Sequence, residues 1–152
     1  MGCTCALLDA SNPGPALSTI TTWMERARGW RLPPRVLVDQ VNRCLMPALT
    51  YKCLFLGKAH LEKVEKHLWS SIADVCHLSP TTPLAARLAT TAHGGLNLQR
   101  LHLKVAQCQI KEASLHLAGL GHPVIEHLLK QCLHTPRNQL LQLLGHAADA
   151  LG

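Results

Sequence analysis

Apolar residues recur at helical spacing in segment after segment of this chain, and this repeat constrains the fold more than any other feature. In the segment 58–75 the apolar positions form one stripe: Leu61, Val64, Leu68, Ile72 and Val75. Spacing of this kind is typical of amphipathic helices that bury one face. No segment of the sequence makes a persuasive strand. The sequence therefore predicts an all-α fold, an irregular helical bundle of about six to seven helices.

Proline and glycine separate the helical segments. The Pro33-Pro34 pair suits the first turn of a helix, and the Gly94-Gly95 pair interrupts the pattern further on. The expected helices cover residues 16–28, 34–55, 58–75, 83–90, 98–117, 123–133 and 136–151. The chain then divides into an irregular lead-in over 1–15, a helical bundle over 16–98, and a helical extension packed on it over 99–152.

The second expected helix runs straight through Pro47. Proline inside a helix removes a backbone hydrogen bond and crowds the carbonyl four residues back, at a cost of roughly 3 kcal/mol. We expect a kink near Arg43, with the helix resuming beyond it. The apolar side of this helix is expected to carry four residues: Leu37, Val41, Leu45 and Ala48.

Charge and cysteine content limit the classes to which the protein can belong. The formal net charge is +6, and the window 26–66, with nine Lys or Arg and three acids, accounts for all of it. Such an excess suits a polyanionic partner. Seven cysteines without a CxxC pair indicate buried thiols in a reducing compartment, and no apolar run is long enough for a membrane span. We expect an intracellular protein, in the cytoplasm or nucleus, with no membrane partner.

The chemistry-bearing residues do not form a recognisable site. The densest metal-ligand patch, His122, His127, Cys132 and His134, lacks the paired cysteines of a zinc site. Cys76 and His77 are adjacent, so on a helix they point in different directions. Phosphate-binding glycine loops and adjacent acid pairs do not occur in the sequence. The sequence predicts no catalytic residue, no metal site and no cofactor.

Basic side chains at helical spacing are the remaining candidates, as contacts to nucleic-acid phosphates. They lie on the second and fifth expected helices: Arg35, Arg43, Lys52, Arg100, Lys104 and Lys111. The alternative is that these faces are simply solvated. Trp69 stands on the polar side of its helix, where it either packs under the next loop or contacts a partner.

Three motifs in order resemble the segment after the catalytic palm of LINE-type (non-LTR retrotransposon) reverse transcriptases. The stretch TTWMERARGWRLPPRVLVDQVNRCLMPALTYKC matches the family pattern at eight positions: Trp23, Leu32, Pro33, Asn42, Leu45, Pro47, Leu49 and Tyr51. A turn at 78–83 and the GGLNL of 94–98 match the family's L-P-x-x-T-P and G-G-L-G-L/I, with Asn97 in place of a glycine. The match covers roughly residues 16–98.

This resemblance implies a thumb, the helical bundle that holds the template–primer duplex, followed by a helical linker. The palm with its paired catalytic aspartates has no counterpart here, so the resemblance implies a catalytically inactive fragment. Its expected partners are RNA or an RNA–DNA hybrid, bound weakly and without specificity. A palm domain, another protein or a second copy is expected on the exposed apolar stripes. The alternative function is a helical protein-interaction module or a decayed remnant with no nucleic-acid role.

Overall fold

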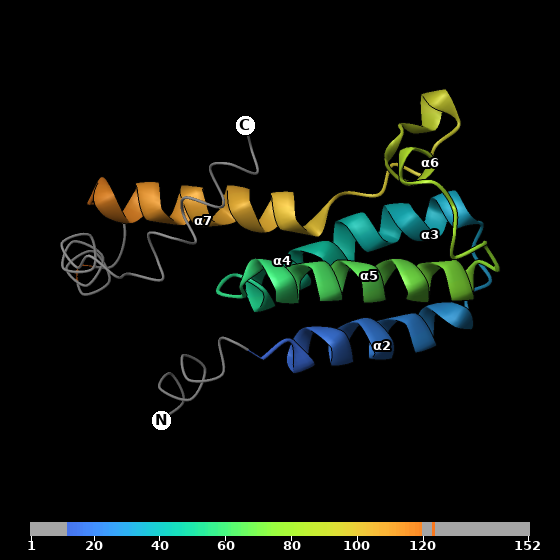
Figure 1. Cartoon of the computed structure of the whole chain (residues 1–152), viewed down its shortest axis with the longest axis horizontal. Coiled ribbons are helices and arrows are strands. Elements are labelled where there is room, and N and C mark those ends of the chain that lie inside the picture. The colour runs from blue at the N-terminus through green and yellow to red at the C-terminus, as the bar shows by residue number, and fades with distance from the viewer. Residues whose placement is uncertain (1–11, 120–122, 124–152) are drawn as a thin grey trace. The chain divides into compact units, whose positions relative to one another are not determined.

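The computed structural model describes residues 12–119 and residue 123, and every regular element in this part of the chain is helical (Figure 1). The elements in chain order are α2 (Gly14–Arg28), α3 (Pro34–Gln40), the π-helical turn η1 (Val41–Leu45), α4 (Met46–Lys52), α5 (Lys58–Val75), α6 (Leu84–Leu88), the 3₁₀ turn η2 (Thr91–His93) and α7 (Leu101–Leu117). The all-α prediction is confirmed for these residues. Because α3, η1 and α4 follow without a break, they make one continuous helix, and the described residues contain five helices in all. The helices expected over 123–133 and 136–151 lie outside the described residues.

The chain divides into two compact units, Met1–Leu101 and His102–Gly152. In the first unit α2, α5 and the continuous helix α3–η1–α4 lie side by side (Figure 1). Their facing sides are almost wholly aliphatic: Ala16, Ile20, Met24, Leu37, Val41, Leu45, Leu49, Leu61, Val64, Leu68 and Ile72 are buried. The helical stripes of the sequence thus meet in one core, as amphipathic helices require.

The turn η1 explains how the second helix passes Pro47. The N–H of Met46 donates to the carbonyl oxygen of Val41, five residues back instead of four. Pro47 then stands in the first turn of α4, where the backbone N–H groups have no intrahelical partner in any helix. The proline therefore follows a π-turn that already interrupts the regular hydrogen bonding, and this turn includes Arg43, where a kink was expected.

The π-turn also keeps the apolar stripe on one side. Leu37, Val41, Leu45, Leu49 and Cys53 are all buried, and each is four residues from the last. In a regular helix of 3.6 residues per turn, each such step drifts by about 40° around the axis. The wider turn of η1 offsets much of this drift. The expectation that Ala48 lies on the apolar side is wrong, because the extra residue turns Ala48 to solvent and Leu49 inward.

A compact loop joins α5 to α7. Helix α5 ends in a Schellman motif, in which the N–H of Leu78 donates to the carbonyl of Ala73 and His77 has a left-handed backbone. Further on, the backbone of 96–98 folds back on α6: the N–H groups of Leu96 and Leu98 donate to the carbonyls of Ala86 and Arg87. These bonds fix the segment 94–99 against the short helix.

Helix α7 begins at Leu101, three residues later than expected, so Arg100 precedes the helix instead of lying on it. Within the second unit, α7 has a buried side with Val105 and Ala106 and an exposed side with Gln107, Lys111 and Ser114.

Candidate nucleic-acid interface

The six predicted phosphate contacts fall into two sets. Arg35, Arg43, Lys52 and Arg100 belong to the first unit and are exposed. Lys104 and Lys111 lie on α7 in the second unit, where Lys104 is half-buried and Lys111 is exposed. The structure therefore unites four of the six in one compact unit, three of them along the continuous helix α3–η1–α4.

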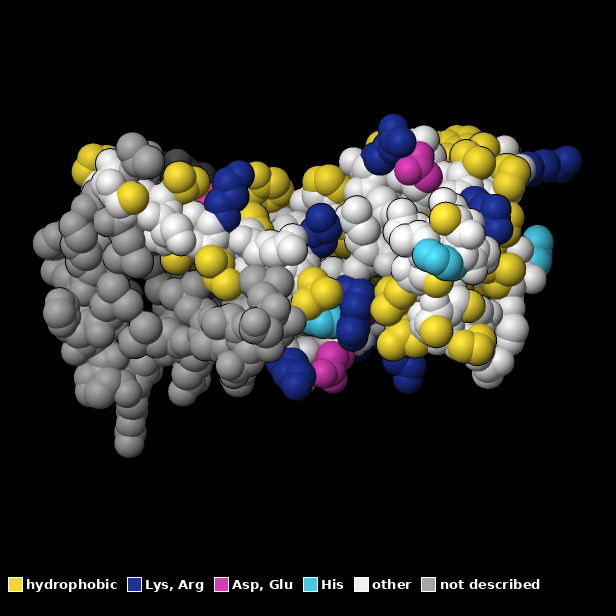
Figure 2. All heavy atoms as spheres, turned by 90° about the horizontal axis from the view of Figure 1, so that it is seen from above, with side chains coloured by type: hydrophobic (Ala, Val, Ile, Leu, Met, Phe, Trp, Pro, Cys, Tyr) yellow, Lys and Arg dark blue, Asp and Glu magenta, His cyan; other side chains and the backbone are white. Residues whose placement is uncertain are grey.

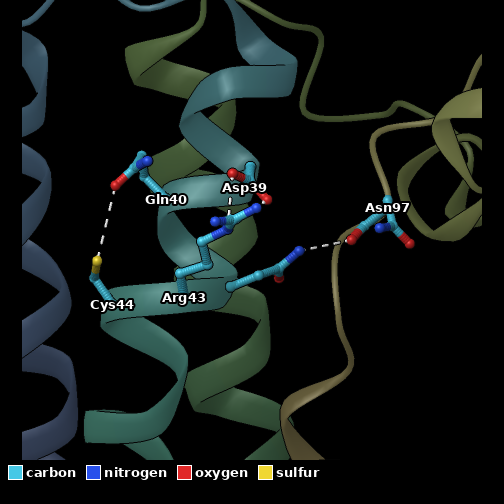
Figure 3. Close-up of polar contacts among 6 residues, drawn as sticks. Asp39, Gln40, Arg43, Cys44 and Asn97 are labelled. Atoms are coloured by element: carbon cyan, nitrogen blue, oxygen red, sulfur yellow. Dashed lines mark hydrogen bonds and ion pairs between the residues drawn. The ribbon is translucent and has the colours of Figure 1, made fainter.

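Arg43 is held by an acid on its own helix. Its Nε lies 3.1 Å from Oδ1 and 3.0 Å from Oδ2 of Asp39, one turn earlier (Figure 3). Both side chains are at least half exposed, so this pair adds at most a few tenths of a kcal/mol to folding. Asp39 also offsets part of the positive charge of Arg43.

Lys52 bridges two helices. Its ammonium donates to Oγ1 of Thr19 on α2 at 2.6 Å. An ammonium has three donors, so this bond leaves two for a phosphate. The contact places Lys52 on the side of α4 that faces α2, whereas Arg43 pairs with Asp39 away from α2 in the close-up (Figure 3).

The basic side chains do not merge into a continuous track on the face of the first unit seen in Figure 2. Lys and Arg appear there as separate spots among apolar and neutral side chains. Separate charges suit weak contacts to a backbone better than a deep electrostatic groove.

Trp69 packs under the loop that follows its helix. Its side chain is only 6% exposed, and its indole Nε1 donates to the carbonyl oxygen of Pro80 at 3.2 Å. The guanidinium of Arg87 lies over the ring, 4.2 Å from its centroid, and also donates to the carbonyls of Thr82 and Pro80. The first of the two interpretations of Trp69, packing under the next loop, is confirmed.

Asn42 joins two of the motifs found in the sequence. Its Nδ2 donates to the carbonyl oxygen of Asn97 at 2.8 Å, along the dashed line that reaches Asn97 in Figure 3, and its Oδ1 accepts from the N–H of Gln99 at 3.1 Å. Asn97 has a left-handed backbone with φ of 57°, which asparagine tolerates better than other residues with side chains. The carboxamide thereby ties the GGLNL segment to η1.

Gly95 is required by the same loop. A Cβ built on it would lie 2.1 Å from the carbonyl oxygen of Ala89, a distance that no real side chain tolerates. Its N–H donates to the carbonyl of Thr90 at 3.0 Å. The second glycine of the motif therefore permits a close backbone approach.

Sequence reasoning did not select the aromatic and arginine residues at the α2–α3 turn. Trp23 and Trp30 make an edge-to-face contact with ring centroids 5.4 Å apart, and Trp30 is 49% exposed. The available signal was the stretch WMERARGWR, in which two tryptophans and three arginines stand within nine residues. Two more aromatics are exposed near the end of α4, Tyr51 and Phe55.

Metal-ligating side chains do not gather in the described residues. Within 12–119 no three His, Cys, Asp or Glu side chains lie close enough to hold a metal ion. The patch at His122, His127, Cys132 and His134 lies outside the described residues. Burial raises the pKa of the thiols of Cys53, Cys76 and Cys108, which makes them poor nucleophiles. Among the helices of the described part, none has the length and apolar character to cross a bilayer.

No protein-family model, curated protein or solved structure matches this chain. The interpretation of the site therefore depends on its own geometry.

Proposed function

We propose that the chain is a thumb-type helical module of the LINE reverse transcriptase kind, inactive as a polymerase by itself, that binds RNA or an RNA–DNA hybrid. Arg35, Arg43, Lys52 and Arg100 contact phosphates from the first unit, and Lys104 and Lys111 add contacts from α7. Binding is weak and independent of base sequence, because phosphate contacts carry no sequence information.

The observation that carries this proposal is the double hydrogen bond from Asn42 to the backbone of Asn97 and Gln99. Asn42 belongs to one family-like motif and Asn97 to another, more than fifty residues later. Pro47 and Gly95, also motif residues, serve a π-turn and a close backbone approach. Motif residues that cooperate in one fold support descent from a common fold, which a chance match of letters would not predict.

The electrostatics support weak binding. Four of the proposed side chains are exposed in one unit, but Arg43 shares its charge with Asp39. The logarithm of the association constant should fall by roughly 0.9 for each phosphate contact per tenfold rise in salt. A handful of contacts therefore predicts measurable binding at low salt and little at high salt.

The test is the fluorescence anisotropy of a labelled RNA–DNA hybrid titrated with the purified chain between about 50 and 200 mM salt. The triple variant Arg35→Ala/Arg100→Ala/Lys104→Ala should weaken binding and reduce the salt slope. Lys58→Ala/Lys63→Ala/Lys66→Ala removes the same charge from the exposed side of α5 and is the matched control. A folded chain that does not bind at low salt, or equal effects of the two triple variants, would contradict the proposed interface.

A protein-binding role is the second candidate, and exposed apolar side chains favour it. Val36, Tyr51 and Phe55 are all more than two-fifths exposed in the first unit. Such residues suit a palm domain, another protein or a second copy of the chain. Light scattering over a range of protein concentrations tests self-association, which through apolar contacts should persist at high salt.

A further inference from the structure

The turn between α2 and α3 presents an exposed tryptophan on a rigid support. Trp30 is 49% exposed, although tryptophan is highly buried on average. The planes of Trp23 and Trp30 meet at 87°, in edge-to-face contact. This geometry is favourable for aromatic pairs and holds Trp30 in place while part of its surface stays open. The turn itself is fixed, because the N–H of Trp30 donates to the carbonyl of Ala27 at 3.0 Å.

Three arginines surround this tryptophan in the sequence. Arg26, Arg28 and Arg31 are all exposed. Arg28 is anchored by an ion pair with Asp74 of α5, so its charge is partly neutralised. Arg26 lies one helical turn after Trp23 on α2, and Trp30 follows in the turn after the helix. Arg26 and Arg31 take part in neither of the two ion pairs of the described residues.

Arg31 has an unusual backbone. Its φ is 50°, in the left-handed region that favours glycine. A long side chain in this conformation costs conformational energy, and such positions gather at functional sites. Glycine would fit the turn better, so the charge of Arg31 offers a reason for keeping arginine there.

We propose that Trp30 stacks on an unpaired base of single-stranded nucleic acid, while Arg26 and Arg31 contact the adjoining phosphates. This inference rests on the proposed nucleic-acid role and adds a second, base-dependent contact to it. Aromatic platforms flanked by basic side chains bind single strands in this way, with little sequence preference. Net positive charge at the turn favours a polyanion over a neutral or basic peptide, and a flat aromatic face favours a base over a carboxylate.

The experiment compares two single-stranded DNA probes of equal length and charge, oligothymidine and its abasic counterpart. Both are labelled and titrated with the full chain at low salt. The wild-type chain should bind oligothymidine more tightly than the abasic strand. Trp30→Ala should lose about tenfold or more on oligothymidine and little on the abasic strand. Trp30→Phe should keep part of the preference, and Tyr51→Ala, which removes another exposed aromatic, should keep all of it.

The outcomes separate this inference from the proposed function. Equal binding of the two probes by the wild-type chain, or a base preference that survives Trp30→Ala, would overturn stacking by Trp30. Hybrid binding that persists in either case would leave the proposed function standing. Trp30-dependent binding of oligothymidine without hybrid binding would keep the stacking site and overturn the thumb-type function. The comparison of probes and Trp30→Phe keep the test decisive even if Trp30→Ala does not fold.

Discussion

The carboxamide of Asn42 bonds to the backbone of Asn97 in one direction and of Gln99 in the other. Nδ2 donates to the carbonyl of Asn97 at 2.8 Å, and Oδ1 accepts from the N–H of Gln99 at 3.1 Å. A side-chain amide has both a donor and an acceptor group, which neither aspartate nor leucine of similar size can supply. The π-turn that holds Asn42 and the loop that holds Asn97 are therefore one structural unit.

Asn42→Ala should lower the free energy of unfolding by about 1 to 2 kcal/mol, because two hydrogen bonds are lost at once. Asn42→Asp keeps the acceptor for Gln99 but sets a carboxylate oxygen against the carbonyl oxygen of Asn97, so its loss should be at least as large. Urea unfolding followed by circular dichroism measures both. Gln40→Ala on the same helix is the control and should change stability by less than about 0.5 kcal/mol. A cost for Asn42→Ala no larger than that of the control would mean that the two bonds add no stability.

Gly95→Ala should be far more damaging than Gly94→Ala. A Cβ at Gly95 meets the backbone of Ala89, with the carbonyl oxygen at 2.1 Å and the carbonyl carbon at 2.5 Å, and backbone cannot move aside as a side-chain tip can. We expect a loss of more than about 2 kcal/mol. Gly94 has φ of 77° but open space around its Cβ position, so its substitution should cost about 1 kcal/mol. Thermal unfolding of both variants compares them, and similar losses would contradict the close approach.

The sequence was sufficient to predict the fold class because the apolar periodicity is strong in each long helix. The stripe of α5 is buried at Leu61, Val64, Leu68 and Ile72, as its spacing indicated. The phase of the second helix beyond Pro47 could not be predicted in the same way. A π-turn adds a residue to one turn and shifts every later position, and the prediction from 3.6 residues per turn therefore placed Ala48 inward in error.

The stability of Pro47→Ala shows whether Pro47 destabilises its helix or fits the helix without cost. A proline that broke a regular helix would give about 3 kcal/mol of stability on replacement by alanine. Because Pro47 stands in the first turn of α4, after the bond from Met46 to Val41, its missing N–H costs little here. We expect a change of less than about 1 kcal/mol in the free energy of unfolding. Urea unfolding measures it, and a gain near the larger figure would refute the role of the π-turn.

Cys53 should make stability depend on alkaline pH. Burial raises the pKa of its thiol from 9.0 to about 11, an effect that nearby Lys52 partly opposes. Between these values the unfolded chain loses the proton while the folded chain keeps it, so stability is full below about 9 and falls as the pH rises to about 11. Urea unfolding at pH about 8 and about 10.5 should show a smaller loss in Cys53→Ala than in the wild type. Equal losses would show that the thiol is not shielded in the fold.

The sequence predicts only part of the candidate interface. Helical phase identified exposed basic residues, but it could not show that Lys52 donates to Thr19 across two helices or that Arg100 precedes its helix. The pairing of Arg43 with Asp39 follows from their spacing of four. The exposure of Trp30 depends on how the residues of the α2–α3 turn pack, and local sequence patterns do not predict this packing.

Arg31 and His77 allow backbone strain and charge to be separated. Both have left-handed backbones, with φ of 50° and 54°, and both side chains are exposed. Glycine at either position should raise the free energy of unfolding by about 0.5 kcal/mol, since relief of strain slightly exceeds the added entropy of the unfolded chain. Only Arg31→Gly should also weaken binding of oligothymidine, because it removes the charge next to Trp30. Urea unfolding and anisotropy on the two variants measure both effects. If Arg31→Gly gained stability and bound the strand as tightly as His77→Gly, the charge of Arg31 would have no part in recognition.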